Sequence, residues 1–244
     1  MEGDRKAILL GNAARHHAKA GVILGLVEWI ASHTGAKFGY LTEAANTVGA
    51  QLVGALPQTN GLNTRDMLTS GQMKAAVLLN TEVAGDLSPA YQAGDALRRF
   101  DMVVSMSPFK VNMDVSDVLL PIAPFTETSG SFVNAEGRLQ SFHAVVKPLG
   151  DTRPAWKVLR VLGNLLGLDG FDHETSQSVL AVSGLQQTIL QRLSNHSTVS
   201  FDLSPAPGEP CTAAIYELDS IVRRASSLQL TADGKAAATL KDVA

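Results

Sequence analysis

The chain has 244 residues, with 20 Lys and Arg against 23 Asp and Glu, so its formal net charge is −3. This length allows one large domain or two small ones, with a substantial hydrophobic core. Apolar residues make up 45% and charged residues 18%, a composition that excludes a disordered chain. The near-neutral balance and the low aromatic content argue against a nucleic-acid-binding protein.

Cysteine usage and hydropathy exclude several further classes. Cys211 is the only cysteine, which rules out an internal disulfide, a Cys-based zinc site and an iron–sulfur cluster ligated within the chain. The longest apolar stretch, residues 20–31, contains Glu28 and is shorter than the roughly 20 residues that span a bilayer. The N-terminus has no signal-peptide pattern. We therefore expect no direct membrane insertion.

The first 120 residues alternate between strand and helix patterns. Short apolar runs predict strands at 7–10, 37–41, 74–79, 101–106 and 118–120. A helix is predicted over 13–32, and a second one from Ser88, an N-cap before Pro89, to Arg98 and Arg99 in its last turn. This order predicts an α/β fold with a doubly wound, mostly parallel sheet flanked by helices.

After residue 121 the pattern changes. Residues 131–142 predict two short strands around a turn at 134–137, where Gly137 is placed to adopt a positive φ. Residues 154–166 have the apolar spacing of an amphipathic helix, and Gly167 is its expected end.

The C-terminal third is predicted to be helical and then irregular. Residues 174–193 form one or two helices with a break at 183–184. A Ser-, Thr- and Pro-rich linker follows at 195–210, then a short ordered piece at 212–224 and a loose tail at 231–244.

Signals for common chemistries are weak. The loop at residues 11–16 lacks both the dinucleotide fingerprint and the P-loop pattern, although a helix N-terminus with Arg15 could hold an anion. Adjacent His16 and His17 point about 100° apart on a helix and cannot share a metal, and no nucleophile-elbow sequence is present. We therefore expect no catalytic residue and no metal ligand.

Residues 117–140 stand apart because their polar residues are dense and lie at the expected carboxyl end of the sheet, where doubly wound folds bind ligands. Glu136 and Arg138 could form an ion pair, and Asn134 could cap the turn. The residues alone leave two interpretations open, a structural turn and a ligand site.

The run SDVLLPIAPFTETSGSFVNAEGRLQSF resembles a segment of molybdopterin-oxidoreductase-type proteins, ADVVLP followed by E-x-x-G-T-F-x-N-x-E-G-R-x-Q. The matching residues are Asp117, Val118, Leu120, Pro121, Glu127, Gly130, Phe132, Asn134, Glu136, Gly137, Arg138 and Gln140. The flanking runs TEAANTVGAQLVGALP, KPLGDTRPAWKVLRVLGNLLGL and IYELDSIVRRASSLQLT resemble the C-terminal part of the large iron–sulfur subunit of bacterial NADH-quinone oxidoreductase, respiratory complex I.

The resemblance implies a specific organisation and role. Residues 1–195 would be the C-terminal portion of a larger molybdopterin-oxidoreductase-like domain, and 196–244 a linker with a helical or irregular extension. The segment would be a cofactor-free scaffold in a peripheral-arm subunit, while the whole complex passes electrons from NADH to quinone. Iron–sulfur clusters are expected in the N-terminal part of that subunit, and molybdopterin is not expected here. Partners would be the rest of the subunit and other peripheral-arm subunits, on the cytoplasmic side of the inner membrane.

The motif residues receive a structural rather than a catalytic or cofactor-binding role. Glu127, Asn134, Glu136 and Arg138 are expected to hold a buried turn through hydrogen bonds and an ion pair, so Arg138→Ala should destabilise the domain. Two alternatives remain: part of an active molybdopterin oxidoreductase of the formate-dehydrogenase type, and a stand-alone nucleotide-binding α/β domain.

Overall fold

The computed structural model describes residues 3–15, 17, 19–87, 91–194, 215–217 and 219–235. The chain divides into two compact units, and each is described by itself. The first comprises Met1–Ala55, Phe132–Gln140 and Gly184–Ala213, and the second comprises Leu56–Ser131, Ser141–Ser183 and Ala214–Ala244. The predicted linker at 195–210 lies outside the described residues. The residues that follow it, from Ala214 onward, are grouped with the second unit.

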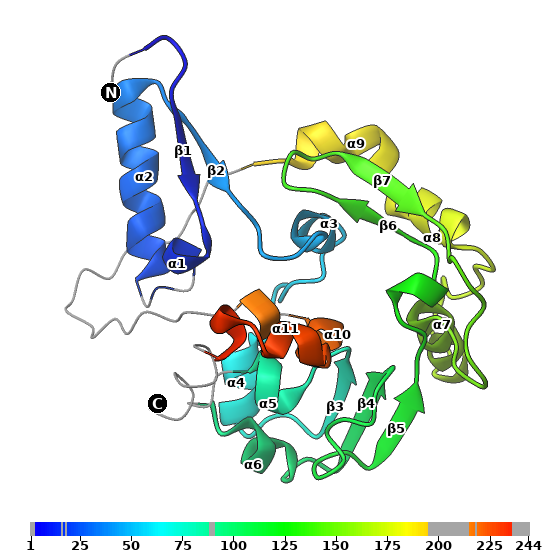
Figure 1. The fold of residues 1–244 in the computed structure, drawn as a ribbon. Coiled ribbons are helices and arrows are strands. Elements are labelled where there is room, and N and C mark those ends of the chain that lie inside the picture. Colours follow the sequence, from blue (N-terminus) through cyan, green and yellow to red (C-terminus); the bar gives the residue numbers. More distant parts are fainter. Residues whose placement is uncertain are drawn as a thin grey trace. The chain divides into compact units, whose positions relative to one another are not determined.

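The first unit is built on a short parallel sheet. Its elements are β1 (Ala7–Leu10), α1 (Asn12–Arg15), α2 (Ala20–Thr34), β2 (Lys37–Tyr40), α3 (Thr47–Leu52) and α9 (Leu185–Arg192) (Figure 1). β1 and β2 pair in parallel, as predicted. The expected burial of β1 on both faces is wrong, because only Leu10 is buried and Leu9 is exposed. The single helix expected over 13–32 is two helices, and α2 ends at Gly35, whose φ of 70° favours a residue without Cβ.

A small hydrophobic cluster holds α3 and α9 together with the hairpin of β6 (Gly130–Val133) and β7 (Leu139–Phe142). Leu52, Val133 and Leu185 are its buried residues. Asn46 supports the same cluster, because its side-chain oxygen accepts a hydrogen bond of 2.9 Å from the backbone N–H of Val133. The predicted break in the 174–193 helix occurs at Gly184, which has a φ of 65°.

The second unit contains the larger sheet. Its elements are α4 (Thr64–Thr69), β3 (Ala75–Leu79), α5 (Val83–Asp86), α6 (Ala93–Leu97), β4 (Met102–Ser107), β5 (Val118–Pro121), η2 (Phe125–Glu127), α7 (Ala155–Leu165), α8 (Ser176–Ser183), η3 (Ile215–Glu217), α10 (Ser220–Arg223) and α11 (Ser226–Gln229). The strand order is β3-β4-β5, and both pairings are parallel. The α/β class with parallel sheets and flanking helices is therefore confirmed, with these strands and the β1–β2 pair in separate sheets.

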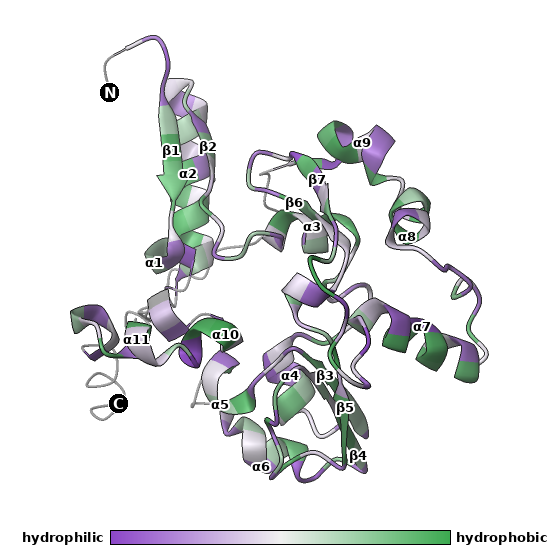
Figure 2. Ribbon diagram, turned by 45° about the vertical axis from the view of Figure 1, so that its right-hand side comes forward, coloured by the Kyte–Doolittle hydropathy of each residue, from purple (hydrophilic) through white to green (hydrophobic). Residues whose placement is uncertain are grey.

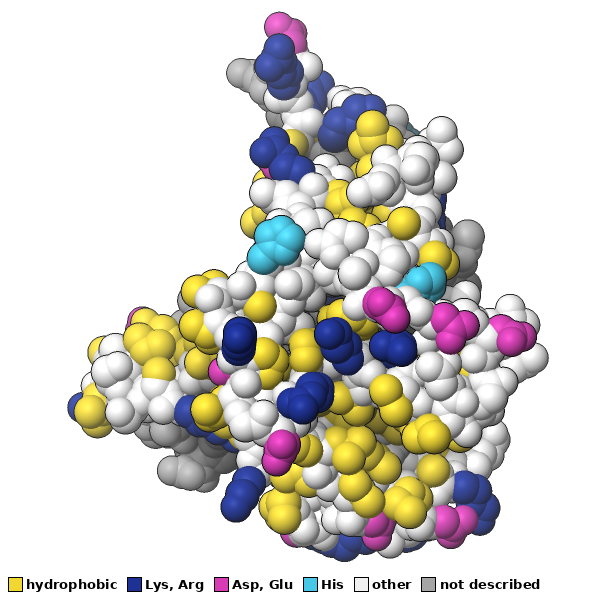
Figure 3. Space-filling model, turned by 90° about the vertical axis from the view of Figure 1, so that its right-hand side faces the viewer, with side chains coloured by type: hydrophobic (Ala, Val, Ile, Leu, Met, Phe, Trp, Pro, Cys, Tyr) yellow, Lys and Arg dark blue, Asp and Glu magenta, His cyan; other side chains and the backbone are white. Residues whose placement is uncertain are grey.

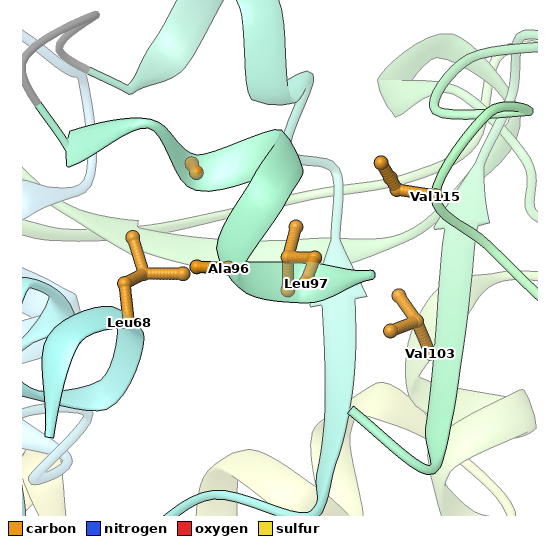
Figure 4. Packing of buried hydrophobic residues seen from close by; sticks show 6 residues of the cluster. Leu68, Ala96, Leu97, Val103 and Val115 are labelled. Carbon is orange, nitrogen blue, oxygen red and sulfur yellow. The ribbon is translucent and has the colours of Figure 1, made fainter. Parts of the chain in front are cut away.

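The main core of the second unit is packed against β4. Figure 4 shows Leu68 of α4, Leu97 of α6, and Val103 of β4 with Val115 converging on this core. Met106, three residues further along β4, is completely buried. Figure 2 shows that the residues of β4 are mostly hydrophobic, which is the pattern that predicted this strand. Along α7, hydrophobic and hydrophilic residues alternate, as in an amphipathic helix.

Some predicted boundaries differ in the structure. The N-cap predicted at Ser88 and Pro89 lies outside the described residues, and the helix that follows is α6, with Gln92 before its first residue. The predicted loose tail begins with an ordered turn, because the N–H of Lys235 donates to the carbonyl of Thr231. No helix among the described residues is long and apolar enough to cross a membrane.

Candidate functional site

Polar side chains gather at the carboxyl ends of β3 and β4, the edge where parallel α/β sheets hold ligands. β4 ends with two buried serines, Ser105 and Ser107. Asn80, directly after β3, has a φ of 52°, and its N–H donates to the carbonyl of Met106 at 2.9 Å. Because Ser107 accepts from the N–H of Phe109 at 3.1 Å, its hydroxyl tightens the turn that leaves β4.

Asn112 connects these strand ends to one another. Its Nδ2 donates to the carbonyl of Thr81 at 2.8 Å and to Oγ of Ser105 at 3.2 Å, and its Oδ1 accepts from the N–H of Val83 at 2.9 Å. Ser105 also lies 2.7 Å, oxygen to oxygen, from Ser116. Asn112 has a φ of 55°, a conformation that Asn tolerates better than most residues. The network fixes the loops after β3 and β4 in one arrangement.

The C-terminal segment covers the same edge, as Figure 1 shows for α10 beside α5. Arg223 of α10 forms an ion pair with Asp86 and lies 3.5 Å from a carboxylate oxygen of Glu82. Arg224 reaches the other oxygen of Glu82 at 2.6 Å, and its guanidinium lies 4.0 Å from the centre of the Phe109 ring. Two arginines thus occupy the space directly after the carboxyl ends of β3 and β4.

The charge of Arg223 is held firmly. Burial of its guanidinium acts to lower the pKa, but the hydrogen bond and the charge of Asp86, together with Glu82, outweigh burial and raise the pKa above its ordinary value. Arg223 therefore stays protonated throughout the physiological pH range.

Six of the matching motif residues, those from Asp117 to Gly130, lie in the second unit. Three of them have a structural role that the contacts define. The carboxylate of Asp117 accepts from the N–H of Val103 at 2.7 Å, which joins β5 to the start of β4. Glu127 accepts from the N–H of Leu149 at 2.9 Å. A Cβ on Gly130 would lie 2.9 Å from the ring of Phe142, so a larger residue here would require that ring to shift.

The other motif residues form the β6–β7 turn in the first unit. The side-chain oxygen of Asn134 accepts from the N–H groups of Glu136 at 3.0 Å and Arg138 at 2.9 Å, so Asn134 caps the turn as the sequence predicted. Gly137 has the expected positive φ, 80°. The expectation of a buried turn with an ion pair is wrong: Glu136, Arg138 and Gln140 are exposed, and Glu136 and Arg138 form no ion pair with each other. The turn points its charges into water.

A cavity of about 550 Å³ opens beside Glu127 in the second unit. Its walls carry Lys147, Arg153, Lys157 and Glu174. The guanidinium of Arg153 is directed at backbone carbonyls, with a contact of 2.7 Å to that of Thr152. Basic and acidic side chains also lie together on the face shown in Figure 3. The mixed charge and open shape favour no single ligand.

The weaker sequence candidates have ordinary roles. Arg15, the possible anion ligand, lies over the ring of Tyr40 at 5.6 Å. Burial raises the pKa of Tyr40, a shift that the charge of Arg15 partly opposes. His17 accepts from the N–H of Lys19 at 3.0 Å, and His33 lies against the ring of Trp29 one helix turn earlier. Within the described ranges, no group of three or more His, Cys, Asp or Glu could hold a metal ion.

Comparison with known proteins gives a consistent result. The profile of the family described as molybdopterin oxidoreductase matches residues 2–165. A Bacillus subtilis (strain 168) protein named "Probable oxidoreductase YjgC" is 31% identical over 116 residues, 46% of this chain and 12% of that protein. Staphylococcus aureus proteins from strains USA300 and N315, provisionally named formate dehydrogenases, are 36% identical over 75 residues, 30% of this chain and 8% of theirs. The chain thus spans about a tenth of the length of these relatives.

Proposed function

Because the chain belongs to the molybdopterin oxidoreductase family, we propose that it is a structural, cofactor-free portion of a peripheral-arm subunit of NADH-quinone oxidoreductase. One observation carries the structural role: three of the polar motif side chains accept hydrogen bonds from backbone N–H groups of their own chain. Asp117, Glu127 and Asn134 all do so. A side chain that fixes a strand or a turn in this way stabilises the fold, and no second partner is needed to explain it.

The family cofactor is a poor fit to the carboxyl edge of β3 and β4. Molybdopterin carries phosphate, and this edge presents the carboxylates of Glu82 and Asp86, which would repel it. The only cations that contact these carboxylates among the described residues, Arg223 and Arg224, neutralise them from within the chain. The charge at this edge is therefore balanced without a ligand, which supports a segment that serves as scaffold.

The assignment to the NADH-quinone oxidoreductase subunit is supported by the sequence runs on both sides of the motif. In this proposal, the partners of the chain are the remainder of its own subunit and the neighbouring peripheral-arm subunits. The chain reaches the cytoplasmic side of the inner membrane through the complex and takes no part in the chemistry itself.

A second candidate is part of an active molybdopterin oxidoreductase of the formate-dehydrogenase type. The names of the Staphylococcus aureus relatives favour it.

Fractionation of native cells distinguishes the two candidates. An antibody against the chain is used on soluble and membrane fractions, followed by purification of the reactive protein and assay of both activities. We expect a band several times larger than 25.8 kDa in the membrane fraction, copurifying with NADH-quinone reductase activity. Copurification with formate oxidation instead, or a soluble band at 25.8 kDa, would contradict the proposal.

A further inference from the structure

The carboxylates of Glu82 and Asp86 and the ring of Phe109 form one continuous surface at the carboxyl edge of β3 and β4. We propose that this surface is a guanidinium-binding site, and that its ligand is the arginine pair of the C-terminal segment, residues 215–235. The inference concerns this chain's own contacts and does not depend on the proposed function.

The two arginines divide the surface between them. Glu82 offers one oxygen to each, at 3.5 Å from Arg223 and 2.6 Å from Arg224, while Asp86 pairs with Arg223. The second oxygen of Asp86 accepts from the N–H of Glu82 at 2.7 Å, so a backbone hydrogen bond independent of Arg223 also fixes this carboxylate. Preorganised acceptors of this kind reduce the entropy lost on binding.

The ligand chemistry is specific to a guanidinium. Arg223 uses its Nε to donate to the carbonyl of Glu217 at 2.5 Å while its terminal nitrogens face the carboxylates. Arg224 places a flat, delocalised cation over the ring of Phe109 and also donates to the carbonyl of Ser220 at 2.7 Å. A lysine ammonium has neither the planar fork nor the second donor along its stem, so it could not make both sets of contacts.

Gly85 provides the room for Arg223. A Cβ at position 85 would lie 2.6 Å from the guanidinium carbon of Arg223, closer than real atoms approach. Gly85 lies inside α5, where glycine is a poor helix former, so its presence is explained by this close approach and not by helix stability.

The ion pair between Arg223 and Glu82 is more buried than an ordinary surface ion pair. The side chains of Arg223 and Glu82 are 14% and 16% exposed, whereas Arg98, which contacts Asp95 and Asp114, is 49% exposed with partners at 69%. Water screens the Arg98 pairs, and such pairs contribute little to stability. The Arg98 cluster is therefore a matched control on the same unit.

Hydrogen exchange with chemical rescue tests the proposal on the full chain. In Arg223→Ala we expect the amides of residues 219–230 to exchange about tenfold faster or more, since hydrogen bonds to charged groups are lost, while those of α7 stay unchanged. Ethylguanidinium at millimolar concentration should restore protection, and ethylammonium or sodium chloride at equal ionic strength should not. Asp95→Asn should leave the exchange of residues 219–230 unchanged. Unaltered exchange in Arg223→Ala, no rescue, or equal rescue by all three salts would overturn the proposal.

Gly85→Ala provides an independent test, because the proposal and helix propensity predict opposite effects of this substitution on hydrogen exchange. Helix propensity alone predicts that alanine slows the exchange of α5. If Gly85 makes room for the guanidinium, Gly85→Ala should instead speed the exchange of residues 219–230 severalfold. Slower exchange in both segments would show that Arg223 has no fixed position against α5 and would overturn the proposal.

Discussion

The β6–β7 turn and the carboxyl edge of β3 and β4 differ in where their polar groups lie. The turn carries the denser motif, yet Glu136 and Arg138 are exposed and the turn is held by the single side chain of Asn134. The edge carries no recognisable motif, yet Ser105 is completely buried and Asn112 makes three hydrogen bonds there. A dense polar motif therefore identified the family, while the stabilising polar network lies at the edge.

The largest effect should come from the strand that supports the edge. Met106→Ala should lower the free energy of unfolding by about 2–5 kcal/mol, because it leaves a cavity in a completely buried position of β4. Met102→Ala on the same strand, 44% exposed, is the control and should cost less than about 1 kcal/mol. Urea unfolding measures both. Equal losses would mean that β4 is not packed as described.

Asn112→Ala should cost about 2–3 kcal/mol, since the N–H of Val83 and the carbonyl of Thr81 lose the hydrogen bonds that Asn112 makes to them. The buried Ser105 hydroxyl loses one of its two partners and keeps Ser116. Asn60 also has a positive φ, 67°, but is exposed, so Asn60→Ala measures the cost of the backbone conformation alone. The difference between the two variants in urea unfolding isolates the hydrogen bonds. No difference would show that the network contributes nothing to stability.

Gly137→Ala should cost about 1–2 kcal/mol, because alanine is strained at a φ of 80° and its Cβ would collide with Leu193. Gly150→Ala, at a φ of 58° with open space around the Cβ, carries the strain without the collision. We therefore expect Gly137→Ala to lower the melting temperature more than Gly150→Ala. The reverse order would mean that the turn does not pack against Leu193, the residue that follows α9.

Arg138→Ala should change the free energy of unfolding by no more than about 0.5 kcal/mol, since the side chain is exposed and unpaired with Glu136. The sequence alone led us to expect that Arg138→Ala destabilises the domain, because Arg138 was assigned a buried ion pair. The exposed position of Arg138 now predicts a small effect instead. Glu136→Ala should behave in the same way in thermal unfolding. A loss above about 1 kcal/mol in either variant would contradict this prediction and show that the charged side chains of the turn stabilise the fold.

Local patterns explain what the sequence predicted well. The continuous apolar runs of β3 and β4 predicted parallel strands, and Asn134 with Gly137 predicted a tight turn, because each signal lies within a few residues. The predicted burial is correct for β4 but wrong for β3, in which Val77 and Leu79 are exposed.

Long-range partners explain what the sequence could not predict. Asn112 bonds to residues about thirty positions earlier in the chain, and Arg223 and Arg224 meet Asp86 and Glu82 about 140 positions away. No periodic or local sequence pattern predicts either set of contacts. The positive φ of Asn112 is the one local feature, and a lone Asn in a loop is too common to indicate it.

The central claim is that this chain belongs to a protein of the molybdopterin oxidoreductase family in which the family cofactor is no longer held by this domain. The most direct measurement is the molybdenum and pterin content of the whole native protein that contains the chain, by elemental mass spectrometry and by fluorescence of the oxidised pterin. We predict iron without stoichiometric molybdenum or pterin. One molybdenum and its pterin per polypeptide would contradict the claim.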